Sequence, residues 1–137
     1  MTTYVIESEP KAEDILRLDD LLHAYNVERT GLTDGRRLAV FLRGSRGEVI
    51  GGLLGWTWGG TCYVDLLFLP AALRRQKKGI QLISTAEVEA RARGCERMVV
   101  RTHDFQAPDF YRKLGFMRVC EVEYPQGYRN ITFLKPL

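Results

Sequence analysis

An apolar strand, a strongly basic turn and a helix follow one another without a break between residues 61 and 94, and this order constrains the fold most. The strand spans Thr61 to Leu69, and the turn carries Arg74, Arg75, Lys77 and Lys78. The N-terminus of a helix leaves backbone N–H groups without partners and carries the positive end of the helix dipole. Together with the cationic side chains, this pattern predicts a phosphate or pyrophosphate site.

The helix after the basic turn is expected from Lys77 to Arg93. Leu82, Ile83 and Ala86 fall on one face, and Gly94 follows as a stop signal. The segment from 97 to 102, with Met98, Val99 and Val100 at its centre, comes next and predicts another strand. A strand–helix–strand unit whose strands are neighbours must be a parallel, right-handed crossover.

The remaining segments predict further strands and helices around this unit. A helix is expected after Pro10, with Ile15, Leu18, Leu22 and Tyr25 at helical spacing, then a short helix or loop from 26 to 36. A short helix is expected at 108–114. The other expected strands are 3–8, 37–43, 48–56, 116–124 and 128–135. Strands interspersed with helices indicate an α/β or α+β fold, and with no linker or repeat we expect a single domain over 1–137.

Composition excludes several classes of protein. The 137 residues are 45% hydrophobic and 27% charged, and no apolar run reaches the length of a membrane span. Cys62, Cys95 and Cys120 form no ligand pattern, so we expect buried thiols in a reducing compartment and no metal. The absence of a signal-like N-terminus predicts a cytoplasmic protein without a membrane partner. A net charge of +3 gives no argument for nucleic acid.

Two downstream segments carry a family resemblance. They are Phe105-Gln-Ala-Pro-Asp-Phe-Tyr111 and Phe110-Tyr-Arg-Lys-Leu-Gly-Phe116. With the element order and the basic turn, they resemble small bacterial members of the GNAT family of N-acetyltransferases. The resemblance implies a mixed, mostly antiparallel sheet of six to seven strands flanked by helices. It also implies direct transfer of an acetyl group from acetyl-CoA to a primary amine, without a metal or covalent enzyme intermediate.

The resemblance assigns the basic turn to the pyrophosphate of coenzyme A. The cofactor-binding residues that it implies are Leu67, Phe68, Leu69, Arg74, Arg75, Gln76, Lys77, Lys78 and Gly79. A backbone N–H among the first three would stabilise the oxyanion. Lys77 stands where the family has its first glycine, and a lysine is tolerable there if residue 77 needs no positive φ.

Tyr111 and Asp65 are the expected catalytic residues. The resemblance implies that Tyr111 protonates the departing thiolate, whereas helical spacing alone makes it a core aromatic residue. Strand alternation predicts that Asp65, Leu67 and Leu69 share one side of the sheet. A carboxylate in so apolar a strand would have a raised pKa, which suits a general base. Substrate binding and a structural role stay equally open for Asp65.

The acceptor side is less defined by the sequence. His103, beside Asp104, is an alternative base, and Glu121, Glu123 and Tyr124 are further candidates to line this side. These acidic residues favour a cationic small-molecule amine over a protein or peptide amine. The resemblance also allows a homodimer. The alternative function is a non-catalytic acyl-CoA-binding or protein-interaction module on the same fold.

Overall fold

The computed structural model describes residues 1–104 and 108–137, so the predicted Phe105-Gln-Ala segment lies outside the described residues. The chain divides into two compact units, residues 1–33 and residues 34–137.

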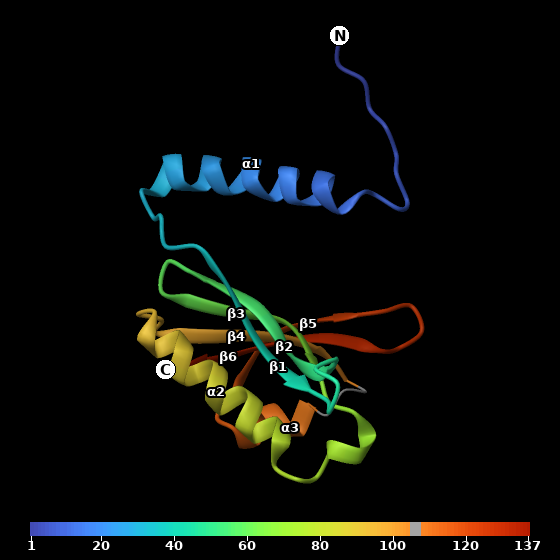
Figure 1. Cartoon of the computed structure of the whole chain (residues 1–137), viewed down its shortest axis with the longest axis vertical. Coiled ribbons are helices and arrows are strands. Elements are labelled where there is room, and N and C mark those ends of the chain that lie inside the picture. The colour runs from blue at the N-terminus through green and yellow to red at the C-terminus, as the bar shows by residue number, and fades with distance from the viewer. Residues whose placement is uncertain (105–107) are drawn as a thin grey trace. The chain divides into compact units, whose positions relative to one another are not determined.

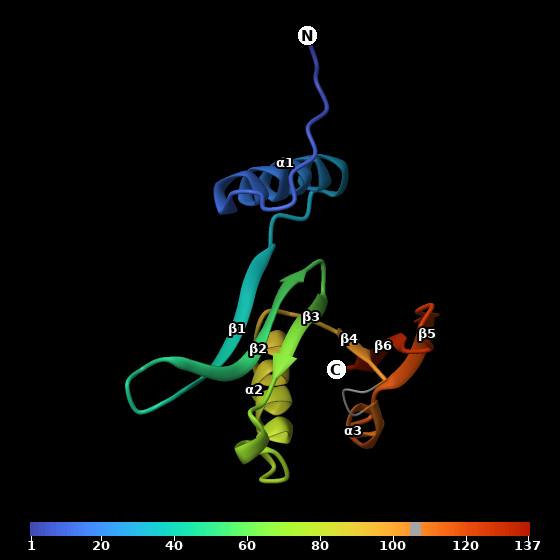
Figure 2. The same ribbon diagram turned by 90° about the vertical axis from the view of Figure 1, so that its right-hand side faces the viewer.

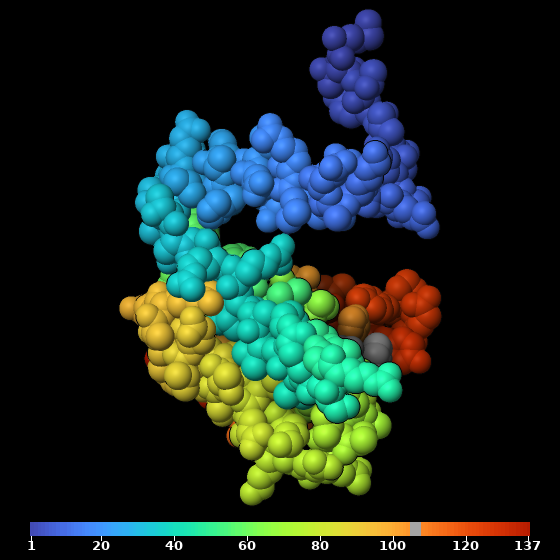
Figure 3. Space-filling view, in the orientation of Figure 1, coloured from blue at the N-terminus to red at the C-terminus, as the bar shows by residue number. Residues whose placement is uncertain are grey.

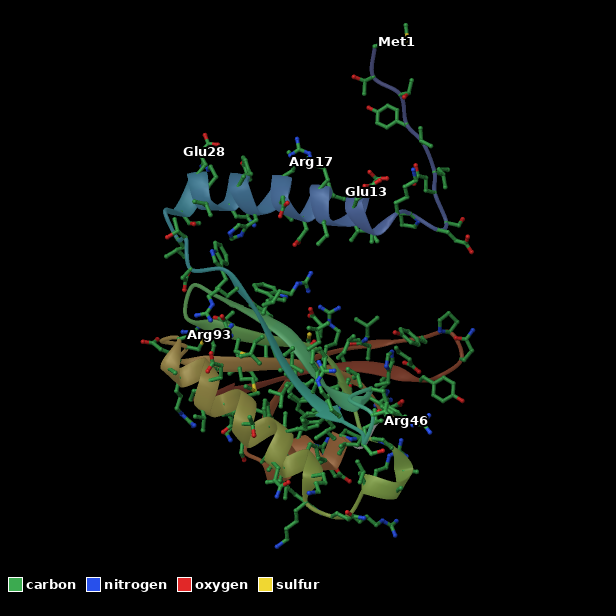
Figure 4. The ribbon with its side chains drawn as sticks, viewed as in Figure 1. Met1, Glu13, Arg17, Glu28, Arg46 and Arg93 are labelled. Atoms are coloured by element: carbon green, nitrogen blue, oxygen red, sulfur yellow. The ribbon has the colours of Figure 1, made fainter. Side chains whose placement is uncertain are left out.

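The first unit consists of an N-terminal segment and one long helix. Helix α1 (Ala12–Thr30) ends at Gly31, whose left-handed backbone lets its N–H bond to the carbonyl of Val27. Glu13, Arg17 and Glu28 project from one side of the helix (Figure 4). The prediction of a strand at 3–8 is wrong, because this unit contains no second strand with which those residues could pair. The helix also continues through the first part of the segment 26–36.

The second unit is built on a six-stranded sheet (Figure 1). Its strands are β1 (Arg36–Arg43), β2 (Val49–Trp58), β3 (Thr61–Phe68), β4 (Arg97–His103), β5 (Met117–Glu123) and β6 (Arg129–Pro136). They lie in the order β1-β2-β3-β4-β6-β5, and every neighbouring pair is antiparallel except β3 and β4. This confirms the mixed, mostly antiparallel sheet, and the parallel pair is the predicted crossover unit.

The crossover helix covers one face of this sheet. After a short 3-10 turn, η1 (Ala71–Leu73), α2 (Lys78–Ala92) runs along β1 and β2 (Figure 3). A short helix, α3 (Pro108–Lys113), packs through Tyr111 against Phe133 of β6. Alternate residues of the strands meet these helices and form the core, which includes Leu53, Val64, Ile83, Met98 and Val100. Cys62 and Cys95 belong to this core, but the prediction of burial is wrong for Cys120, which lies exposed on β5.

The parallel strands β3 and β4 are paired over only the first part of their length. Their register runs from Thr61 opposite Arg97 to Val64 opposite Val100 and stops there. A bulge in the β2–β3 ladder leaves Asp65 without a partner on β2 at the same level. Beyond it, β3 stays paired with β2 while β3 and β4 diverge toward their carboxyl ends (Figure 2). The sheet is therefore split between β3 and β4.

Candidate active site

A cleft of about 840 Å³ opens beside this split, within the second unit. Leu67, Phe68 and Leu69 form one wall, and the basic turn continues from it. Thr102 of β4 and residues of α3, including Tyr111, form the opposite wall. The volume lies within the usual range for a small-molecule or cofactor site, roughly 300–1,000 Å³.

The basic turn presents a row of unpaired backbone donors. The N–H groups of residues 75 to 80 find no acceptor among the described residues, whereas those of Arg74 and Gln81 bond to Ala71 and Lys77. They lie at the positive end of the dipole of α2. Such a cluster of N–H groups binds an anion, so this end of the cleft has the donors that a phosphate requires.

The backbone of this turn is left-handed at two residues that are not glycine. Arg75 has a φ of 63° and Lys77 a φ of 60°. The structure thus requires a positive φ at residue 77, which is the conformation that a glycine adopts without cost. Lysine at this position keeps the N–H group but leaves the backbone strained.

The side chains of the turn have different tasks. Arg74 donates from Nε to the carbonyl of Leu69 at 3.0 Å, and Gln76 donates to the carbonyl of Ala72 at 2.8 Å, so both fasten the turn to itself. Arg74, Arg75 and Lys77 line the cleft, whereas Gln76 and Lys78 do not, and Arg74 is already bonded to Leu69. Arg75 and Lys77 are therefore the cations placed to meet a bound anion.

Gly79 is needed for packing as well as for access to the loop. A Cβ atom built there would lie 3.0 Å from Cζ of Phe110 and 3.2 Å from Cδ1 of Leu69. A side chain at this position would push α2 away from α3. The glycine therefore brings the helix N-terminus close to the aromatic ring that lines the cleft.

Tyr111 serves the core and the cleft together. Its ring stacks on Phe133 with centroids 5.6 Å apart and meets Phe116 edge-on at 5.7 Å. Among the described residues, none forms a hydrogen bond with its hydroxyl group, and the hydroxyl oxygen is not fully buried. Because the residue lines the cleft, this oxygen is available to a ligand. Burial raises the pKa of Tyr111 to about 12, which keeps the phenol protonated at neutral pH.

Asp65 differs from what strand alternation predicts. Val64 is buried and pairs with Gly55, whereas Leu66 is exposed and pairs with Leu54, so the bulge at Asp65 reverses the alternation. Leu67 then shares the face of Val64, and Asp65 is exposed to solvent. Asp65 is therefore not the buried carboxylate that the sequence predicted. An exposed carboxylate beside the split is better placed to attract an ammonium group.

Several residues of the cleft were not predicted from the sequence. Ile80, Thr102, Asp109, Phe110 and Lys113 also line it. Lys113 lies within the second of the segments that carry the resemblance, but nothing in the sequence says that α3 faces α2. The placement depends on the contact between Gly79 and Phe110.

The part of the chain that the structure describes contains neither a metal-ligand cluster nor a membrane-spanning helix. Over residues 1–104 and 108–137, no group of three or more His, Cys, Asp or Glu side chains is arranged to hold a metal ion. In the same part of the chain, no helix has the length and apolar character that crossing a membrane requires.

Comparison with known proteins identifies the family. The model of the acetyltransferase (GNAT) family matches residues 3–116. An acetyltransferase of Agrobacterium fabrum is 36% identical over 132 residues, which are 96% of each chain. A blasticidin-S acetyltransferase of Streptomyces morookaense is 38% identical over 119 residues, covering 81% of this chain and 85% of that protein.

Solved structures agree with this assignment. A crystal structure from Agrobacterium tumefaciens, assigned as an acetyltransferase, is 34% identical, with a TM-score of 0.87 over 99% of this chain and 100% of that chain. An acetyltransferase from Bacillus cereus shares the fold at 24% identity, with a TM-score of 0.76 over 98% of each chain. The chain belongs to the GNAT family of acetyltransferases. The predicted resemblance is confirmed, and so is its consequence that the protein is an acetyl-CoA-dependent N-acetyltransferase.

Proposed function

We propose that this protein acetylates the primary amine of a small, cationic molecule by direct attack of the amine on acetyl-CoA. The observation that supports this most is the construction of the cleft. One end has the unpaired N–H groups of residues 75 to 80, and the other end reaches the split between β3 and β4 beside Tyr111. An extended molecule with a pyrophosphate near one end and a thioester at the other matches both ends.

The basic turn would bind the pyrophosphate. Arg75 and Lys77 add charge to the backbone donors, and both side chains reach the cleft. The edge of β3 beyond Val64 is unpaired on the side of β4, so alternate peptide groups from Asp65 to Leu69 can bond to the pantetheine arm. An N–H group of this edge would also stabilise the oxyanion of the tetrahedral intermediate.

Tyr111 would protonate the departing thiolate of coenzyme A. When nitrogen bonds to the carbonyl carbon and the carbon–sulfur bond breaks, the electron pair stays on sulfur. The phenol is protonated and its oxygen has no hydrogen-bond partner among the described residues, so it can donate as charge develops on sulfur. Asp65, exposed beside the split, would hold the acceptor's ammonium group.

The name of one relative supports a small-molecule acceptor. That relative, a blasticidin-S acetyltransferase, aligns over 81% of this chain. We therefore place blasticidin S in the first assay panel, with spermidine, a free amino acid and a peptide with an open N-terminus. CoA release would be followed with a thiol reagent against a blank without acceptor. Rapid release with a small molecule supports the proposal. Tight acetyl-CoA binding without release in any reaction would instead favour the non-catalytic module.

The pyrophosphate assignment can be tested separately by reversing single charges. Lys77→Glu places a carboxylate in the cleft, whereas Lys78→Glu makes the same charge change on a neighbouring side chain outside it. We expect Lys77→Glu to weaken acetyl-CoA binding about tenfold more than Lys78→Glu in calorimetric titration, because only the former replaces a direct contact. Equal losses would reject a direct contact by Lys77.

A further inference from the structure

A histidine and a tyrosine form a hydrogen-bonded pair at the carboxyl end of β4. Nε2 of His103 lies 2.9 Å from the hydroxyl oxygen of Tyr124, and the ring centroids are 5.5 Å apart. His103 is the last residue of β4, and Tyr124 follows β5, where its N–H bonds to the carbonyl of Tyr128. The pair therefore ties the end of β4 to the turn between β5 and β6.

The strand register places this pair on the face opposite the cleft. Thr102 is opposite Ile131 and is buried on the face that the helices cover, where it also lines the cleft. His103, opposite Asn130, must point to the other face of the sheet. It is only one residue beyond Thr102, roughly 3.3 Å along the strand. Because β3 and β4 are not paired at this level, the split can be reached from that face.

We propose that this pair accepts the proton that the acceptor's ammonium group must lose before it attacks the thioester. The inference rests on the proposed function. Acetyl-CoA would occupy the cleft, and the amine would approach the split from the opposite face.

The proton transfer runs through the phenol of Tyr124. Its oxygen takes a proton from the ammonium nitrogen as its own proton passes to Nε2 of His103. The neutral imidazole, protonated on Nδ1, becomes an imidazolium ion. The neutral amine then bonds to the carbonyl carbon. As the carbon–sulfur bond breaks, the electron pair stays on sulfur and takes the phenol proton of Tyr111, and the second proton that the nitrogen loses on becoming an amide restores that phenol. The proton taken from the ammonium group and the proton given to sulfur would thus be carried by groups on opposite faces of the sheet.

Neighbouring charges come from the elements next to this pair. Arg101 lies on the same face of β4 as His103, since its neighbours Val100 and Thr102 are both buried on the other face. Arg129 and Glu123 are opposite each other at the ends of β6 and β5. Asp104 follows His103, and its N–H bonds to the carbonyl of Arg129. Charges of both signs therefore surround the pair.

The first experiment compares acceptors whose attacking nitrogen is protonated at pH 7 with one whose attacking nitrogen is neutral. His103→Gln keeps a hydrogen-bonding side chain beside Tyr124 but cannot take up a proton. With spermidine or blasticidin S, we expect kcat/KM at pH 7 to fall about 10²-fold and to recover as pH rises and the amine loses its proton unaided. With benzohydrazide, whose attacking nitrogen is neutral at pH 7, the loss should be small. Tyr124→Phe should behave like His103→Gln.

The matched control is His23→Gln, because His23 is the other of the two histidines in this chain and lies on α1. It should retain the wild-type pH profile. A wild-type profile in His103→Gln, or an equal loss with the ammonium acceptors and benzohydrazide, would overturn the proposal. A wild-type protein that releases no CoA with any acceptor would overturn the proposed function instead.

A second measurement tests the pair without any acceptor. In proton NMR, two histidine C2–H signals can be followed over pH and assigned with the His23 and His103 variants. Removing the hydroxyl in Tyr124→Phe should move the titration midpoint of His103 and leave that of His23 unchanged. An unchanged midpoint for His103 would show that the two side chains are not coupled and would overturn the proposal.

Discussion

The strained backbone of Lys77 gives a prediction whose sign can be worked out from the structure. Lys77 has φ 60° and ψ 13°, in the left-handed region, immediately before the first residue of α2. For a residue with a Cβ atom this conformation costs roughly 1–2 kcal/mol. Glycine removes that cost but adds freedom to the unfolded chain, worth about 0.5–1 kcal/mol. Lys77→Gly should therefore be more stable than Lys77→Ala by about 0.5–1 kcal/mol.

Lys78 provides the matched control because it is the first residue of α2. There the backbone is helical, and glycine is less favourable than alanine by up to about 1 kcal/mol. The order of the two substitutions should therefore reverse between neighbouring positions. Urea unfolding at 25 °C, with unchanged m-values, would give the free-energy differences.

The two variants of Lys77 also separate backbone from charge in acetyl-CoA binding. Both remove the ammonium group, so equal dissociation constants would mean that the lost charge accounts for the effect. A smaller dissociation constant for Lys77→Gly than for Lys77→Ala would mean that relief of backbone strain also helps the loop to bind the anion. If Lys77→Ala were as stable as Lys77→Gly or more so, the left-handed conformation of residue 77 would be refuted.

Other predictions concern the cleft and the core. Tyr111→Phe should lower kcat about 10²-fold with little change in acetyl-CoA affinity. Below pH 10 the pH–rate profile of this variant should keep the basic limb of the wild type, because the pKa of the Tyr111 phenol is about 12. That raised pKa stabilises the fold below pH 10, and the contribution is lost between pH 10 and 12, so the Tyr111→Phe protein should lose less stability over that interval in pH-dependent urea unfolding. Gly79→Ala should lower the unfolding free energy by about 1–3 kcal/mol, since its Cβ would lie 3.0 Å from the nearest ring atom of α3; an unchanged urea midpoint would contradict this. Glu87→Gln should lower the unfolding free energy by about 2 kcal/mol, because the largely buried carboxylate of Glu87 accepts a hydrogen bond from Nζ of Lys135 at 2.7 Å. Glu96→Gln, which breaks an exposed ion pair with Arg97, should lower it by less than about 0.5 kcal/mol in the same assay.

The crossover unit and the anion site could be predicted from the sequence because both depend on local order. An apolar strand followed by cationic residues and a helix start specifies unpaired N–H groups at that point in almost any packing. The spacing of Leu82, Ile83 and Ala86 likewise fixes which face of α2 is buried. Chain order and side-chain periodicity carry this information without a third dimension.

Pairing between strands was predicted less well. Residues 3–8 have the composition of a strand but no partner within their unit, and a strand exists only through hydrogen bonds to a neighbour. The bulge at Asp65 reverses the side of every following residue of β3, and only the register with β2 shows it. For this reason the exposure of Asp65 could not be read from alternation.

The tertiary structure alone decided which chemical groups meet at the split. The sequence marks Tyr111 and the basic turn as separate segments, but Gly79 against Phe110 brings them to one cleft. His103 and Tyr124 are 21 residues apart and pair only because β4 and β5 both flank β6. Local pattern sets the type of each element, whereas contacts between distant residues depend on packing that no short segment encodes.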